Sequence, residues 1–174
     1  MAGKNFDTFF NTIDDLLFVP SSDGTILHVN YTASRRLGYS IDEMIGRNIA
    51  MVHSENDREE AMRIVADMIA GKTLSCPLPV IAKSGLAIPV ETRVVKGEWN
   101  GKPALFGVTK DISQLKLSEQ KFSGIFQQTS VLMSISRISD GMFIDINEAF
   151  LSVFGFARDE VIGKTSFELN IFND

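Results

Sequence analysis

The sequence has few of the residues that build metal and redox centres: one cysteine, two histidines and one tryptophan among 174 residues. A lone Cys76 excludes an intrachain disulfide and a thiolate zinc cluster, and it fits a reducing compartment. His28 and His53 are too few to complete a zinc shell. No nucleophile and base stand at a recognisable catalytic spacing, so an enzymatic function of this chain ranks last among the functional classes.

Positive charge and long apolar runs are also scarce. Seventeen basic residues against 22 acidic ones leave a net charge of −5, and no dense Lys/Arg run offers a footprint for nucleic acid. Apolar runs such as residues 16–20 and 103–108 are far shorter than the ~20 residues of a membrane span. The N-terminus lacks the apolar region of a signal peptide. We therefore expect a cytoplasmic segment that contacts no nucleic acid and does not insert into a membrane.

An internal repeat with an offset of 117 residues divides the chain. The matching pairs are Asp23-Gly24 and Asp140-Gly141, Asn30 and Asn147, Gly38 and Gly155, Asp42-Glu43 and Asp159-Glu160, and Ile45-Gly46 and Ile162-Gly163. Asp174 corresponds to Asp57, so we expect one complete unit followed by the first half of a second. The second copy would have two strands with an open edge, which is compatible with disorder, docking on the first unit or pairing with another chain.

Turn residues predict the first elements of the complete unit. Residues 16–20 and 25–30 flank an Asp-Gly turn, which is typical of a β-hairpin. Asn30 is placed to cap a short helix. Ser40 and Glu43 form a capping box for a second short helix. We expect both helices to be brief connections.

Hydrophobic periodicity predicts the remaining elements. Apolar residues at helical spacing indicate one longer helix over residues 57–70. Three strands rich in β-branched residues follow, over residues 74–82, 86–95 and 103–109. The sequence therefore predicts an α+β unit, with a five-stranded antiparallel sheet and short helices and one longer helix on one face.

Four motifs in this order resemble those of a PAS domain, the sensory box (PAS/PAC) of bacterial-type signalling proteins, over residues 6–116. They are Asp23-Gly24 with Asn30; Gly38-Tyr39-Ser40-x-Asp42-Glu43-x-Ile45-Gly46; Lys83-Ser84-Gly85 with Pro89-Val90-Glu91; and Gly107-Val108-Thr109-Lys110-Asp111-Ile112-Ser113. Residues 122–174 resemble the start of a second PAS domain. The resemblance implies a fragment of a multidomain protein, a two-component histidine kinase or a diguanylate cyclase, whose output lies outside these residues.

The resemblance also implies a small cavity between the sheet and the long helix. Its expected lining is overwhelmingly apolar: Met51, Met62, Val65, Ile69, Val80, Val90, Thr92, Phe106 and Val108. A solid core explains these residues equally well, and the unit would then be a ligand-free scaffold. If a ligand binds, this lining favours a small apolar or aromatic molecule over a dicarboxylate, which would need convergent basic groups.

Residues that serve cofactors in the family are replaced here. Flavin-binding photoreceptor PAS domains carry a reactive cysteine where Ile49 stands, and Cys76 lies elsewhere, which argues against a covalent flavin adduct. Haem-binding members carry a His-Asp pair where this chain has Asn56-Asp57, and Asn56 is not a haem ligand. A flavin- or haem-bearing redox, gas or light sensor is the alternative function.

Residues 111–128 fit a connecting signalling helix that relays a change from the last strand. Asp111-x-x-Gln114 can cap its start. The relay residues implied by the family are Asp111, Ile112 and Ser113. An apolar stripe follows at Leu115, Phe122 and Ile125, which suits a plain linker helix as well as a two-stranded coiled coil. The expected partners are a second copy, a neighbouring PAS unit or the output domain.

Overall fold

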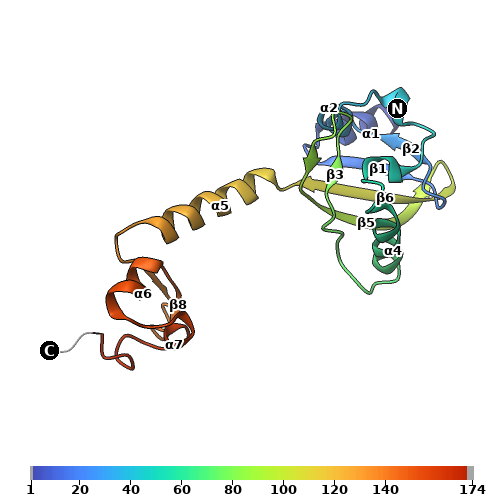
Figure 1. Cartoon of the computed structure of the whole chain (residues 1–174). Helices are drawn as coiled ribbons and strands as arrows, with labels where there is room; N and C mark the ends of the chain where they lie inside the picture. The colour runs from blue at the N-terminus through green and yellow to red at the C-terminus, as the bar shows by residue number, and fades with distance from the viewer. Residues whose placement is uncertain (1, 172–174) are drawn as a thin grey trace. The chain divides into compact units, whose positions relative to one another are not determined.

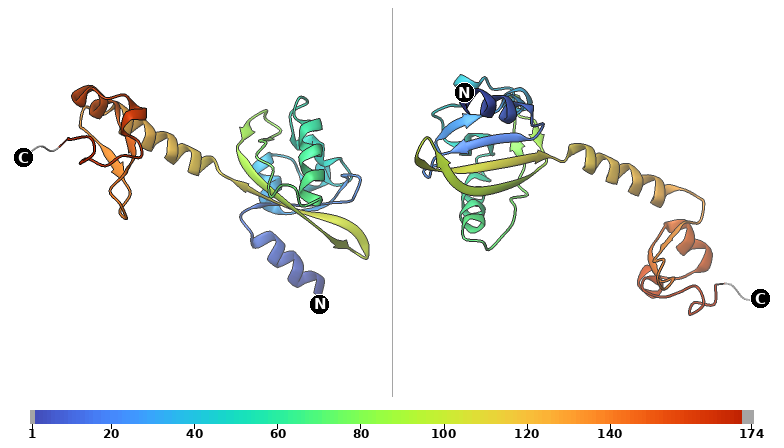
Figure 2. Two further views of the ribbon diagram at one scale, coloured as in Figure 1. Left: turned by 90° about the horizontal axis from the view of Figure 1, so that it is seen from below. Right: turned by 180° about the vertical axis from the view of Figure 1, so that it is seen from behind.

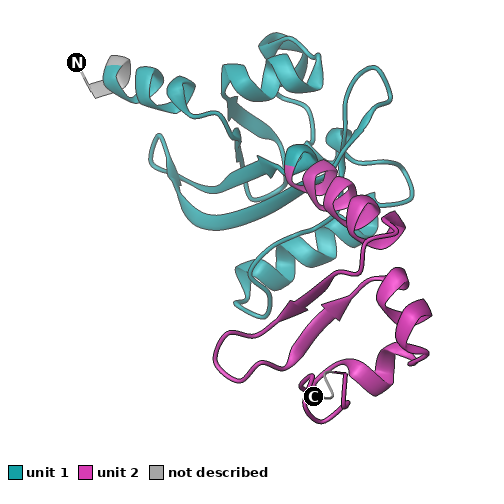
Figure 3. Ribbon diagram, turned by 90° about the vertical axis from the view of Figure 1, so that its left-hand side faces the viewer, with its two compact units in different colours: residues 1–114 teal, residues 115–174 magenta. Residues whose placement is uncertain are grey.

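The computed structural model describes residues 2–171, which belong to two compact units, Met1–Gln114 (unit one) and Leu115–Asp174 (unit two) (Figure 3). Unit one contains eleven elements, most of which Figure 1 labels. They are α1 Ala2–Thr12, β1 Leu16–Pro20, β2 Ile26–Val29, α2 Tyr31–Leu37, α3 Ile41–Met44, the 3-10 helix η1 Ile49–Val52, α4 Arg58–Ile69, β3 Val80–Ile81, β4 Ala87–Ile88, β5 Val90–Trp99 and β6 Lys102–Asp111.

The main sheet of unit one is antiparallel, with strand order β2-β1-β6-β5. The α+β class is confirmed, but this sheet has four strands instead of five. The strand expected at residues 74–82 joins it only through a bridge between Cys76 and Thr92. Pro77 and Pro79 follow Cys76 and have no backbone N–H, so they cannot extend the ladder. The end of this segment instead forms β3, which pairs with β4 in a separate two-stranded sheet.

Another proline divides the strand expected at residues 86–95. Pro89 separates β4 from β5, and its carbonyl accepts a hydrogen bond from Ile112 N–H at 3.0 Å. Beyond it, β5 and β6, each ten residues long, form a hairpin around Asn100 and Gly101. Both turn residues have positive φ, 52° and 74°, as a two-residue hairpin turn of type I′ requires.

Unit one has hydrophobic cores on both faces of the sheet. All five residues of β1 are buried, because alternate side chains of a strand point to opposite faces and both faces are covered. Leu16 and Phe18 belong to the core that contains Val52 of η1, which we call the inner core. Leu17 and Val19 belong to the core that contains Phe10 of α1, which we call the outer core. Figure 2 shows α4 and α1 on opposite sides of the sheet. The sequence predicts helices on one face of the sheet only, whereas α1 also covers the other face.

The predicted helix caps are present. Asn30 accepts a hydrogen bond from Ala33 N–H at the start of α2, and Gly38 ends this helix in the left-handed conformation. Ser40 and Glu43 form the reciprocal capping box of α3. The longer helix is α4, whose bounds fall within the predicted residues 57–70.

Unit two repeats the opening elements of unit one. Its elements are α5 Ser113–Gln128, which begins two residues before the unit boundary, β7 Ser134–Ser136, β8 Phe143–Ile146, α6 Glu148–Phe154 and α7 Arg158–Val161. Antiparallel β7 and β8 lead into α6, which Asn147 caps and Gly155 ends in the left-handed conformation. Phe143, Ile146, Phe150 and Val161 form a small core. Within residues 2–171, β7 pairs with β8 alone.

Candidate functional site

A cavity of about 200 Å³ lies in unit one, between α4 and η1 on one side and the sheet on the other. Its wall is largely apolar. The lining residues are Phe18, Pro20, Ser22, Gly24, Ile49, Ala50, Val52, His53, Arg58, Ala61, Met62, Val65, Ala66, Ile69, Val80, Thr92, Val94, Leu105, Gly107 and Thr109. An engineered apolar cavity of about 150 Å³ holds benzene, so this volume suits a molecule of one ring.

Five of the nine residues expected at a cavity lie in this wall: Met62, Val65, Ile69, Val80 and Thr92. The other four lie elsewhere. Val90 is buried in the inner core, and Met51 packs against that core. Phe106 packs in the outer core on the opposite face, and Val108 is 41% exposed.

The register of the β5–β6 hairpin places Phe106 and Val108 on the face of the sheet opposite the cavity. Residues directly opposite each other in an antiparallel pair share a face of the sheet. Thr92 is paired with Thr109 and Val94 with Gly107. The cavity face of β6 is therefore the odd-numbered one, and a shift of one residue moves every side chain to the other face.

The wall also contains residues before the long helix that the expected lining does not include. Phe18 comes from β1, and Ile49, Val52 and His53 come from η1 and its end. No local pattern marks them, because η1 reaches the sheet through contacts distant in sequence. A signal did exist on β6: the Asn100-Gly101 turn fixes the register that places Thr109 opposite Thr92.

Two basic side chains in the wall are engaged by their own neighbours. His53 Nδ1 lies 3.2 Å from the carbonyl of Pro79, and burial lowers the pKa of this imidazole despite that hydrogen bond and nearby Asp57. Arg58 donates from Nε to the carbonyl of Ala50 at 3.3 Å, and its Nη1 lies 3.9 Å from Glu55. Both basic side chains of the wall thus have partners within the protein.

Cys76 is close to the cavity face without being part of the wall. Its backbone pairs with Thr92, and its side chain is 2% exposed. Burial raises the pKa of the thiol. Ile49 lines the cavity instead. A buried thiol that is protonated at neutral pH is a packing residue rather than a nucleophile.

The expected relay residues lie at the junction of β6 and α5, where α2 provides a partner that no local sequence pattern indicates. Asp111 Oδ1 accepts a hydrogen bond from Ser113 N–H at 2.8 Å, and its other carboxylate oxygen lies 3.5 Å from Arg36 Nη1. Ile112 N–H bonds to Pro89. Asp111 thus reaches the start of α5 through Ser113 instead of Gln114 and is tied to α2 as well.

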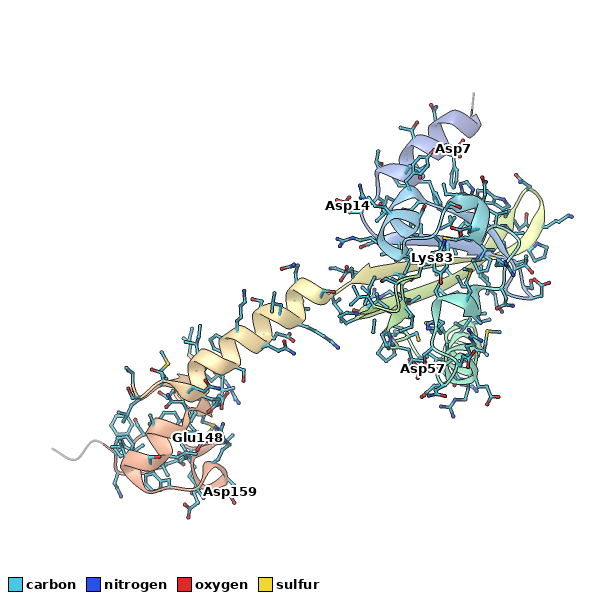
Figure 4. The ribbon with its side chains drawn as sticks, turned by 45° about the horizontal axis from the view of Figure 1, so that its top comes forward. Asp7, Asp14, Asp57, Lys83, Glu148 and Asp159 are labelled. Atoms are coloured by element: carbon cyan, nitrogen blue, oxygen red, sulfur yellow. The ribbon has the colours of Figure 1, made fainter. Side chains whose placement is uncertain are left out.

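The outer face of the sheet carries an aromatic cluster under α1. His28 stacks on Trp99 with ring centroids 4.9 Å apart, and Phe10 lies equally close to His28. Asp7, which Figure 4 labels on α1, has a carboxylate oxygen 3.9 Å from His28 Nε2. Burial lowers the pKa of His28, and Asp7 opposes this effect. This cluster anchors α1 on the sheet.

Two absences hold for residues 2–171. His, Cys, Asp and Glu side chains form no group of three that could hold a metal ion. None of the helices is both long enough and apolar enough to cross a membrane.

An antiparallel sheet with a helix-bounded cavity, followed by an exit helix, defines the class of small sensory α+β domains. The profile of the PAS domain family matches residues 14–114 and 130–173. The chain belongs to the PAS domain family and contains a PAS sensor domain.

Relatives and solved structures agree with this assignment. The chain is 27% identical over 173 residues to a "methyl sulfide methyltransferase-associated sensor" of Methanosarcina acetivorans, covering 95% of this chain but only 16% of that protein. The PAS domain of a Desulfitobacterium hafniense protein is 33% identical with a TM-score of 0.55, covering 60% of this chain and 98% of that one. A domain of a sensory box sensor histidine kinase/response regulator from Geobacter sulfurreducens has 20% identity and a TM-score of 0.52, covering 63% and 94%.

Proposed function

We propose that unit one is a sensory module that binds a small apolar or aromatic molecule and passes the change along β6 into α5. One observation carries this proposal. Thr109 lines the cavity, and Asp111, two residues later on the same strand, bonds to the first residue of α5. Residues two apart on a strand share a face. A displacement of β6 at the cavity therefore changes the position of the Asp111 carboxylate.

A titration of the 15N-labelled chain with toluene tests both steps. We expect saturable shifts of the Gly107 and Thr109 amide signals, together with the Ser113 amide signal. Val65→Phe should reduce toluene binding at least tenfold, because the larger ring occupies a cavity of this size. Ile64→Phe on the same helix is the matched control, since Ile64 does not line the cavity.

Two results would contradict different steps of the proposal. Absence of toluene binding, or binding that Val65→Phe leaves intact, would contradict the proposal that the cavity binds a ligand. Binding that shifts the amide signals of Gly107 and Thr109 but not that of Ser113 would contradict the proposed relay from β6 into α5. The ligand-free scaffold is the reading that the first result would favour.

We propose in addition that α5 mediates self-association. Leu115, Phe122 and Ile125 are 57%, 57% and 69% exposed and fall at the spacing of one helical stripe. A second copy would cover this stripe. Sedimentation velocity should show a concentration-dependent dimer that Phe122→Glu abolishes and that Lys121→Glu leaves intact. A chain that stays monomeric at all concentrations would contradict this.

We infer that the parent protein is a signalling protein of histidine kinase or diguanylate cyclase type, and that residues 122–174 begin a second PAS domain. The curated relative is a sensor, and one structural neighbour comes from a sensor histidine kinase/response regulator. The repeated hairpin and Asn-capped helix of unit two support the second domain. Asp111→Ala in the full-length protein should uncouple input from output and leave the fold intact; unchanged signalling would refute the relay role.

A flavin- or haem-bearing sensor gains no support from the site. The cavity of about 200 Å³ is smaller than the 300–1,000 Å³ typical of sites for drug-sized ligands, and no thiol lines it. An absorption spectrum of the purified chain tests this alternative, because flavin bands or a Soret peak would favour it over a colourless ligand.

A further inference from the structure

Two threonines, Thr92 and Thr109, are the polar side chains that the sheet contributes to the otherwise apolar lining of the cavity. Thr92 and Thr109 are directly opposite each other on β5 and β6, and their Oγ1 atoms lie 2.9 Å apart. The backbone N–H and C=O of Thr92 bond to Cys76, at 3.0 and 2.8 Å, and so point away from Thr109. The two threonines are therefore a non-hydrogen-bonded pair, the type in which cross-strand side chains approach most closely.

The hydroxyl pair has hydrogen-bonding capacity left over. Each threonine hydroxyl has one proton and two lone pairs, and the bond between them uses one proton and one lone pair. The second proton can be donated to a further acceptor. Both threonines line the cavity, and Thr109 is only 2% exposed, so water reaches this hydroxyl poorly.

The neighbouring side chains define which acceptor fits. Val94 and Gly107 adjoin the pair on the cavity face of the sheet, Leu105 is the next residue of that face on β6, and none of the three has a polar side-chain atom. The guanidinium of Arg58 is bonded to the carbonyl of Ala50 and lies near Glu55, and the imidazole of His53 lies against the carbonyl of Pro79. A carboxylate at the threonines would be a buried anion without a partner cation, which is costly. A neutral acceptor meets no such penalty.

We propose that Thr92 and Thr109 are the specificity-determining residues of the cavity, and that its ligand is an uncharged molecule of one ring that carries a single hydrogen-bond acceptor such as a carbonyl oxygen. This inference rests on the proposed cavity function and adds the chemical class of the ligand. The ring fills the apolar space, and the acceptor receives the free threonine proton.

Acetophenone and α-methylstyrene test the proposal, because they have the same shape and differ only in a C=O against a C=CH₂ group. Dissociation constants of both probes are measured by NMR titration for the unaltered chain and for Thr92→Val/Thr109→Val. Valine preserves the shape of threonine, so the cavity keeps its volume. We expect the preference for acetophenone to fall about three- to tenfold in the variant, the equivalent of one net hydrogen bond.

The outcomes separate the two levels of the argument. An equal preference in both proteins would overturn the threonine assignment and leave the cavity function intact. Failure of both probes to bind the unaltered chain would overturn the cavity function and this inference with it. If the double variant does not fold, the infrared carbonyl stretch of acetophenone bound to the unaltered chain decides: a shift to lower frequency than in hexane supports the hydrogen bond, and an unshifted band refutes it.

Discussion

Asn30 and Asn147, 117 residues apart, each accept two backbone hydrogen bonds through Oδ1 within their own unit. Asn30 Oδ1 accepts from the backbone N–H of Leu17 and Ala33, both at 3.0 Å. Asn147 Oδ1 accepts from Met133 at 3.0 Å and Phe150 at 3.1 Å. Both side chains are fully buried. Each asparagine thus caps a helix and ties it to the first strand of the hairpin before it, to Leu17 on β1 in unit one and to Met133 just before β7 in unit two.

Asn30→Ala should destabilise unit one by about 2–4 kcal/mol, because it leaves several buried backbone groups without partners. The side-chain amide of Asn30 also donates to the carbonyl of Asp15 at 2.9 Å. Trp99 is the sole tryptophan and belongs to unit one, so its fluorescence in urea monitors this unit alone. Asn147→Ala is the matched control and should leave the Trp99 transition unchanged. A loss below about 0.5 kcal/mol for Asn30→Ala would contradict the prediction.

Arg36→Gln should loosen the start of α5 with little effect on stability. The Arg36–Asp111 pair is partly exposed, and such pairs contribute at most about 1 kcal/mol. Without Arg36, the Asp111 carboxylate keeps only its bond to Ser113 as a restraint. Hydrogen exchange at the Ser113 amide should therefore accelerate several-fold. Arg35→Gln makes the same charge change one residue earlier and should have no such effect; equal acceleration in both variants would show that overall charge is responsible.

Stability should fall as the pH drops from about 7 to about 5. Burial lowers the pKa of both His28 and His53 below the usual 6.5, so the unfolded chain binds protons first. The contribution of the two neutral histidines to the free energy of unfolding is complete above the pKa of the unfolded chain, and it is lost as the pH falls toward the pKa values of the folded chain. Carboxylates with lowered pKa, such as Asp23 and Glu43, act at lower pH. Urea midpoints monitored by Trp99 check this.

Substitution separates the two histidines. At His28, the charge of Asp7 opposes the lowering of the pKa by burial. At His53, Asp57 raises the pKa and Arg58 lowers it. His28→Gln and His53→Gln should each flatten part of the pH dependence. A midpoint that is constant from pH 5 to pH 7 in the unaltered chain would contradict the prediction.

Cys76 should react slowly with iodoacetamide in the folded chain. Its thiol is buried and its pKa is raised, so both access and the thiolate fraction are low. The reaction at pH 7.5 should be at least ~100-fold slower than in urea, since modification requires local opening. Mass spectrometry of the alkylated chain over time measures both rates. Similar rates in buffer and in urea would mean that the thiol is accessible and reactive.

Local chemistry in the sequence determined the α+β class, the repeat, the capped helices and the Asn100-Gly101 hairpin. Caps and tight turns depend on residues a few positions apart, so Asn30, Ser40 and the turn can be interpreted without a structure. The five-strand count was wrong because Pro77 and Pro79 interrupt a segment of otherwise strand-like composition.

Tertiary structure alone decided which residues meet at the site. Both faces of the sheet are covered, so an apolar side chain such as Phe106 has the same appearance in sequence whether it faces the cavity or the outer core. The contact of Arg36 with Asp111 joins α2 to the end of β6, 75 residues later. Such contacts depend on strand register and on packing between distant elements, which no local pattern specifies.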